Sequence, residues 1–229
     1  MFDALFTTTT EYKKLSHALS GKGACALFGL PASGRAQVYA ALCRQLDKPL
    51  CIVTPGEAEA TRFAADLNTL GIPAAVFPAR DYVLRPIEGT AREYEYRRLA
   101  VLGELVGGRL RAVAVPAEAL TQFTTPKEDF CANTRTLHAG DTLLRDDLLA
   151  ALFGAGYTRR AQVDGPGQFS VRGDIVDIFA PDQKMPVRME FWGDEIDTLH
   201  TFDLTTQRRE DAFDKFYLSP AREDLFGKP

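Results

Sequence analysis

The sequence predicts an α/β fold, in which a parallel β-sheet with flanking helices is joined to a small antiparallel α+β domain. In the first half, short apolar runs alternate with segments of helical periodicity, an order typical of a parallel sheet with helices on both faces. After residue 125, apolar residues recur at alternate positions between turns rich in glycine and proline, which is typical of antiparallel strands. The change of pattern predicts two structural regions.

Elements of the first region follow from run length and apolar spacing. Strands are expected at residues 24–28, 50–53, 74–77 and 111–115, and helices at residues 36–46, 57–70, 90–106 and 116–123. The third of these helices has an apolar stripe that includes Leu99, so we expect its arginines, Arg98 among them, on a solvated face or at an inter-domain contact. Cys25 and Cys51 lie in apolar runs and are expected to be small buried thiols.

The second region begins with one helix at residues 143–152, after a cap signal at Asp141-Thr142 and before two glycines. Strands are expected at residues 168–171, 174–179, 187–192 and 195–202. We therefore predict a first domain at residues 1–125, an inserted domain at 126–208, and a segment at 209–229 that returns to the first domain with a short strand at 216–218. Such an incomplete return indicates a piece of a longer protein.

Composition and charge restrict the function. The net charge of −4 disfavours a protein whose main task is to bind phosphate backbones, so protein partners are the better expectation. No apolar run approaches the roughly 18 residues of a membrane span. The four cysteines form no CxxC pair and the three histidines have no metal-ligand spacing, which fits a cytoplasmic protein without a metal site.

A phosphate-loop spacing occurs between the first expected strand and the first expected helix. Gly29 and Gly34 match the glycines of the phosphate loop G-x-x-x-x-G-K-[ST], whose backbone N–H groups face an anion, and Ser33 lies in the loop between them. However, Arg35 replaces the lysine that reaches the phosphates, and Ala36 replaces the hydroxyl that ligates magnesium. The loop is therefore expected to be vestigial and without catalysis. An ordinary strand–turn–helix corner, a weak anion site and a small NTPase or kinase remain the alternatives.

The second region carries a longer and more specific pattern. The runs Phe169-Ser-Val-Arg-Gly-Asp-Ile-Val-Asp-Ile-Phe-Ala-Pro181 and Val187-Arg-Met-Glu-Phe-Trp-Gly-Asp-Glu-Ile-Asp197 resemble a region shared by two bacterial repair families. These families are the UvrB component of the nucleotide-excision repair excinuclease and the transcription-repair coupling factor (Mfd). The degenerate loop, and a segment at residues 78–89 too short for the DNA-inserting hairpin of UvrB, favour the coupling-factor family.

The resemblance implies a non-catalytic adaptor that recruits UvrA, another component of the excinuclease, with no cofactor of its own. Arg159, Arg172, Arg188 and Glu190 match positions that contact UvrA in UvrB. RNA polymerase and DNA would be bound by domains that lie outside this chain, as would the ATP and magnesium of a motor. A DNA-binding fragment of a UvrB-like protein is the alternative, and Asp174 and Asp177 are alternative partners for the arginines. Trp192, at a turn, is expected to be exposed.

Overall fold

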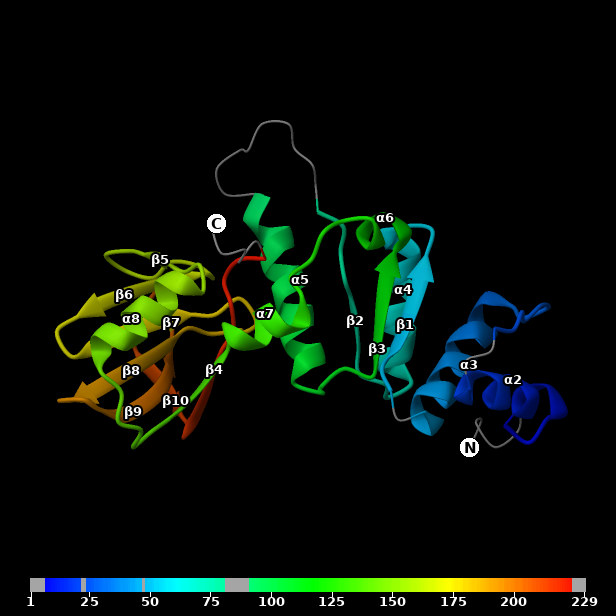
Figure 1. The fold of residues 1–229 in the computed structure, drawn as a ribbon, viewed down its shortest axis with the longest axis horizontal. Helices are drawn as coiled ribbons and strands as arrows, with labels where there is room; N and C mark the ends of the chain where they lie inside the picture. Colours follow the sequence, from blue (N-terminus) through cyan, green and yellow to red (C-terminus); the bar gives the residue numbers. More distant parts are fainter. Residues whose placement is uncertain (1–6, 22–23, 47, 81–90, 224–229) are drawn as a thin grey trace. The chain divides into compact units, whose positions relative to one another are not determined.

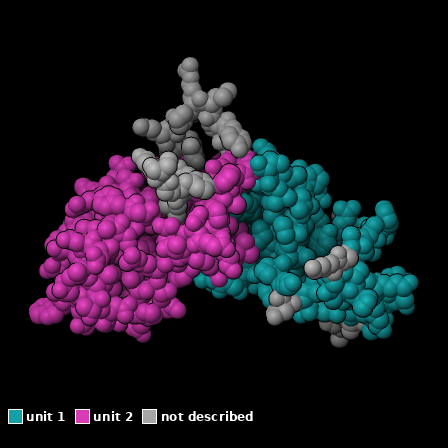
Figure 2. Space-filling model, in the orientation of Figure 1, with its two compact units in different colours: residues 1–79, 107–121 teal, residues 80–106, 122–229 magenta. Residues whose placement is uncertain are grey.

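A computed structural model describes residues 7–21, 24–46, 48–80 and 91–223. The chain divides into two compact units, residues 1–79 with 107–121 and residues 80–106 with 122–229, shown in different colours in Figure 2. This division differs from the predicted boundaries after residues 125 and 208. Helix α5 (Ala91–Val106) belongs to the second unit, and so does the chain after residue 208. The two units are described separately below.

The first unit contains the expected parallel sheet. Its strands are β1 (Leu50–Thr54), β2 (Ala74–Val76) and β3 (Ala112–Pro116), in the order β1-β3-β2, and both pairings are parallel (Figure 1). Helix α4 (Glu57–Thr69) packs against all three strands, and the short α6 (Ala117–Leu120) follows β3. The core between α4 and the sheet includes Phe63 and Leu67. These elements confirm the predictions for residues 50–76 and 111–116.

Residues 24–28 form no strand, which corrects the first predicted element. They are exposed, and Phe28 retains 88% of its accessible surface. Cys25 and Cys51 are likewise exposed, whereas Cys43 is buried, and Val53 is 56% exposed on the same face of β1 as Cys51. An apolar run indicates a preference for burial but does not specify a neighbour to pair with. The prediction that helices cover both faces of the sheet is therefore wrong at this face of β1.

Two helices precede β1. Helix α2 (Thr10–Ser20), which the sequence did not predict, is capped by the Thr9 side chain, which accepts from the Tyr12 N–H. Helix α3 (Ala32–Gln45) begins four residues earlier than predicted. The two helices share a small apolar cluster formed by Tyr12, Val38, Ala41 and Leu42.

The second unit is built on a six-stranded sheet in the order β10-β9-β8-β7-β6-β5. Strands β6 to β10 pair antiparallel with their neighbours, and β5 pairs parallel with β6. The strands are β5 (Thr158–Arg159), β6 (Gln168–Arg172), β7 (Ile175–Phe179), β8 (Val187–Trp192), β9 (Glu195–Phe202) and β10 (Arg209–Ala212). The four longer strands were predicted, whereas the short β5 and β10 were not.

A second, two-stranded sheet joins β4 (Arg135–His138) to β11 (Lys215–Leu218), and α7 (Lys127–Ala132) precedes β4. Strand β11 was predicted to return to the first domain. Instead, Phe216 and Leu218 are buried in the core of the second unit, and β10 pairs with β9 there. The sequence shows that such a strand is apolar on one side but not which unit supplies the complementary surface.

One face of the six-stranded sheet is covered by α8 (Arg145–Gly154), whose Leu148 and Leu152 are fully buried against it (Figure 1). Two tight hairpins connect β6 to β7 and β8 to β9. Each turn begins with a glycine at positive φ, 59° at Gly173 and 64° at Gly193. Other L-residues rarely adopt this conformation, and two-residue hairpin turns require it. These turns fix the register that aligns the polar residues described next.

Candidate functional site

The face of the sheet opposite α8 is polar. Side chains alternate along each strand, so Phe169, Ile178 and Met189 enter the core while their neighbours point to the other face. The register aligns Ser170, Asp177, Arg188 and His200 in one row across β6 to β9, and Arg172, Ile175, Glu190 and Thr198 in the next row. The structure therefore brings three of the four predicted site residues onto one face.

Asp177 is the centre of this face. Its side chain is 1% exposed and accepts hydrogen bonds from both predicted arginines. Arg188 donates from Nε to Oδ1 at 2.6 Å and from Nη2 to Oδ2 at 2.9 Å, and Arg172 donates from Nη2 to Oδ2 at 2.8 Å. Hydrogen bonds between ionised groups are stronger than neutral ones, and the two parallel bonds of Arg188 add geometric specificity.

The two arginines differ in exposure. Arg188 is only 8% exposed, also bonds Gln207, and lies with its guanidinium 4.4 Å from the centre of the Phe202 ring. Its hydrogen bond to Asp177 raises its pKa, so it remains charged although it is buried. The Arg172 side chain, in contrast, is 47% exposed. Of these two residues, only Arg172 presents a charge to solvent.

Glu190 lies beside this pair on β8 and is held by two neighbours. Arg209 from β10 forms an ion pair with its Oε1, and Thr198 Oγ1 lies 3.3 Å from its Oε2. Its side chain is 19% exposed. The carboxylate is therefore part of the polar face, with its charge balanced by Arg209.

Arg159 lies elsewhere. It is exposed at the end of β5 and is paired in register with Phe169. Residues that pair across a sheet point to the same side, so this register places Arg159 on the side of Phe169 and α8. The structure does not bring it together with Arg172, Arg188 and Glu190.

His200 and Ser170 complete the buried row. His200 Nε2 and Ser170 Oγ are buried and have no hydrogen-bond partner within the described part of the chain. Burial lowers the pKa of His200, and the nearby Arg209 and Arg188 lower it further, against the opposing effect of Glu190 and Asp177. His200 is therefore neutral at pH 7.

The hairpin turns border this face. Asp174 pairs with Arg145 at the start of α8, which also donates to the Gly173 carbonyl oxygen at 2.7 Å. Asp174 thus does not engage the site arginines, whereas Asp177 does, so the alternative interpretation of the arginines as partners within the sheet holds for Asp177. Trp192 is 82% exposed at the end of β8, as predicted.

The residues of the phosphate-loop spacing are arranged as a helix start. Gly29 has a φ of 81°, and the N–H groups of Gly34 and Arg35 donate to the Pro31 carbonyl oxygen. Arg35 points toward Glu59 of α4, with 3.7 Å between the charged atoms, and Ala36 is buried in the core under the sheet.

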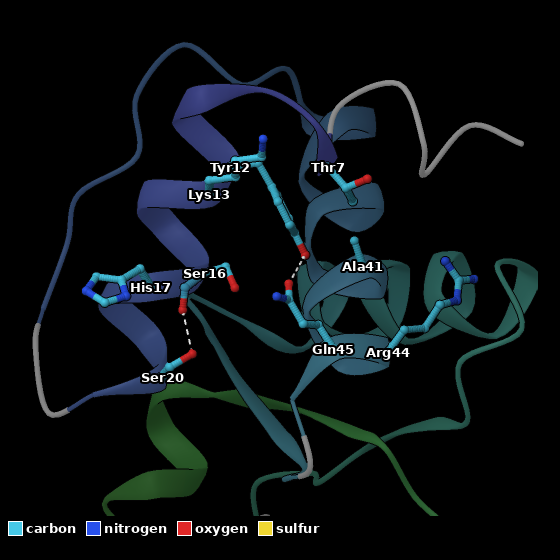
Figure 3. A pocket seen from close by; sticks show the side chains of 9 residues that line it. All are labelled: Thr7, Tyr12, Lys13, Ser16, His17, Ser20, Ala41, Arg44 and Gln45. Carbon is cyan, nitrogen blue, oxygen red and sulfur yellow. Dashed lines mark hydrogen bonds between the residues drawn. The ribbon is translucent and has the colours of Figure 1, made fainter.

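A pocket of about 710 Å³ lies between α2 and α3 in the first unit (Figure 3). Most of its lining residues carry polar groups, and Tyr12 donates from its hydroxyl to Gln45 Oε1 at 3.0 Å across it. Figure 3 shows His17 and Arg44 pointing in different directions, and Arg44 donates to the Leu70 carbonyl oxygen. The basic groups do not converge on a common point, and residues 29–36 are not part of the lining.

Within the described ranges, no group of three or more His, Cys, Asp or Glu side chains is placed to hold a metal ion. No helix in the same ranges is long and apolar enough to cross a membrane.

Four residues that complete the polar face or stabilise its unit were not predicted from the sequence. Arg209 and Gln207 follow the last predicted strand, where no periodic pattern marked them. Arg98, expected on a solvated face or at an inter-domain contact, is fully buried against Glu223, a residue 125 positions away. Two opposite charges so distant in sequence carry no local signal of pairing. Such contacts become visible only once the topology is known.

Residues 136–223, which include the whole polar face, match the family model of the UvrB interaction domain. The chain is 29% identical to the transcription-repair-coupling factor of Bacillus subtilis and 35% identical to that of Myxococcus xanthus, over 86% of this chain in both cases. It is 28% identical to UvrABC system protein B of Chlorobium limicola over 88% of this chain.

Residues 136–223 of the second unit thus match the UvrB interaction domain. Over most of its length the chain is similar to transcription-repair-coupling factors, the family that its sequence motifs favoured. It spans 17% of the length of the Bacillus and Myxococcus proteins and 32% of the Chlorobium protein.

Proposed function

We propose that this chain is a non-catalytic adaptor module that recruits the excinuclease component UvrA in transcription-coupled nucleotide excision repair. The observation that carries the proposal is Arg172, a half-exposed arginine held on the polar face of a UvrB interaction domain. Arginine is enriched among the residues that dominate binding at protein interfaces, because its fork of donors pairs with carboxylates. Arg172, with Glu190 and Arg209 beside it, is the surface offered to UvrA.

The parent protein would add functions that this chain does not carry. We infer that RNA polymerase and DNA are bound by other regions, which also contain the ATP- and magnesium-dependent motor of a translocase in the cytoplasm. The low share of the relatives' length that this chain covers is consistent with such further regions. A UvrA-binding module would then link a stalled polymerase to the repair machinery.

Binding of purified UvrA to the immobilised chain tests this function. Arg172→Ala is expected to weaken binding by about 30-fold, since truncation of a dominant interface residue costs about 2 kcal/mol or more. Arg62→Ala, on the exposed surface of α4 in the other unit, is the matched control and is expected to bind like the wild type. Arg188→Ala is unsuitable, because Arg188 is buried and its loss would leave Asp177 without its main partner.

Equal binding by the wild type and Arg172→Ala would refute the proposed surface. A DNA-binding fragment of a UvrB-like protein is the competing function. It predicts salt-sensitive binding of duplex DNA by the wild type, measured by fluorescence anisotropy, whereas the adaptor is expected to bind no duplex DNA.

A further inference from the structure

We propose that Asp177 and Arg188 are positioning residues, which orient Arg172 for docking without touching the partner themselves. The inference rests on the proposed function and deepens it, because it assigns different roles to two arginines that the sequence treats alike. One arginine makes the contact, and the other one, together with the aspartate, holds it in place.

Arg188 has no free edge to offer a partner. Nε and Nη2 bond the two oxygens of Asp177, Nη2 also lies 3.1 Å from Gln207 Oε1, and Nη1 lies 3.4 Å from the Gln207 carbonyl oxygen. The central carbon of the guanidinium lies over the Phe202 ring, 4.4 Å from its centre. A partner carboxylate would reach Arg188 only after these contacts were broken.

The Asp177 carboxylate is held in place by Arg188. It is directly opposite Arg188 in the register of β7 and β8, and its buried carboxylate has both oxygens occupied by the bidentate pair. Oδ2 has a further lone pair and accepts a hydrogen bond from Nη2 of Arg172. The Asp177 carboxylate, which Arg188 holds in one orientation, therefore fixes one nitrogen of Arg172. This hydrogen bond restricts the orientation of the exposed part of the Arg172 guanidinium.

The charges explain why both residues are needed. Two arginines and one aspartate leave one net positive charge. Because Arg188 neutralises the charge of Asp177, the remaining positive charge resides on the exposed Arg172. Without Arg188, Asp177 would be the sole counter-ion of Arg172 and would draw it inward. The group that Arg172 is prepared to meet is a carboxylate of the partner, in a charge-assisted pair. Fixing a side chain before binding lowers the entropy cost of docking.

The test combines Asp177→Asn with Arg172→Ala in a double-mutant cycle of UvrA affinity. Asp177→Asn alone is expected to bind about 3- to 10-fold more weakly, the cost of one immobilised side chain. In the Arg172→Ala background it is expected to have no further effect, because the residue it positions is gone. Asp174→Asn is the matched control, since Asp174 pairs with Arg145, and it is expected to bind like the wild type.

A second measurement does not need the partner. Side-chain Nε–Hε signals of Arg172 in nitrogen-15 NMR are expected to show a restricted guanidinium in the wild type and a mobile one in Asp177→Asn. If Asp177→Asn does not fold by circular dichroism, Arg188→Lys replaces it. This change keeps the charge but loses the bidentate geometry, and about 2- to 5-fold weaker binding is expected, again with no effect in the Arg172→Ala background.

Additive effects in the cycle, or wild-type affinity and unchanged Arg172 mobility in Asp177→Asn, would overturn the positioning role while the proposed function stands. Loss of the proposed function has a different signature, in which Arg172→Ala binds UvrA as well as the wild type or the wild type does not bind it at all.

Discussion

At the scale of single residues, the polar face of the second unit is defined by how each charge is balanced. Asp177 is shared by two arginines and Glu190 is paired with Arg209, whereas a buried nitrogen of His200 has no hydrogen bond to any residue that the structure describes. His200 is therefore the residue of this face whose protonation changes most directly with pH. Its depressed pKa gives the unit a stability that depends on pH near neutrality.

The sign of this dependence follows from the lowered pKa of folded His200. Between that pKa and the ordinary value of 6.5, the unfolded chain binds a proton that the folded chain does not. Stability is thus complete above pH 6.5 and falls as the pH drops toward the folded pKa, by about 1.4 kcal/mol for each unit between the two values. His200→Gln is expected to lose this part of the slope in urea unfolding curves measured from pH 7.5 to 5.5. Identical slopes in the two proteins would contradict the prediction.

At the scale of elements, a buried carboxylate connects α5 to the chain segments around it in the second unit. Glu223 accepts hydrogen bonds from Arg98 at 2.8 to 3.0 Å, from Arg80 at 2.8 and 3.0 Å and from the Thr124 hydroxyl at 2.7 Å. Its own N–H donates to Glu95 of α5 at 2.8 Å. Burial alone would raise the pKa of Glu223, but the hydrogen bonds from Arg98, Thr124 and Arg80 outweigh it and lower the pKa.

Glu223→Gln is expected to destabilise the chain by about 3–5 kcal/mol at pH 7, because it removes the carboxylate that pairs with the buried Arg98. With a lowered pKa, the stabilisation by Glu223 is present above its unfolded value of 4.5 and is lost as the pH falls through the folded value. The difference between wild type and variant in urea denaturation should therefore shrink below pH 4.5. Glu93→Gln, an exposed change on the same helix, is the control; a difference that stays constant from pH 7 to pH 3 would exclude the ion pairs as its source.

Which elements the sequence could predict depends on the range of the interactions that form them. Strands β6 to β9 and helix α8 have strong local periodicity and glycine turns, and they were predicted to within a few residues. Residues 24–28 have the same apolar character but are exposed without a strand partner, and β10 is too short and polar to be recognised. Arg172 and Glu190 were predicted as site residues from the motif at residues 169–197. The roles of Asp177, Arg209 and Glu223 required the register and the topology.

At the scale of the whole molecule, the two units differ in the features that bear on function. Residues 136–223 of the second unit match the UvrB interaction domain and carry the polar face. The first unit has a parallel sheet and a turn with Gly29 at positive φ before α3, and residues 24–28 before this turn form no strand.

We expect no binding of ATP with magnesium by isothermal titration calorimetry at micromolar concentrations. Arg35 is turned toward Glu59, and the buried Ala36 has no oxygen to offer a metal ion, so both groups that neutralise the phosphates are missing. The same measurement on the Arg35→Lys, Ala36→Thr double variant asks whether the backbone still forms an anion cradle. Binding by that variant alone would show that the loop geometry persists and that only the side chains were lost. Micromolar binding by the wild type would contradict the interpretation of the loop as vestigial. No binding by either protein is expected if the turn serves only to start α3.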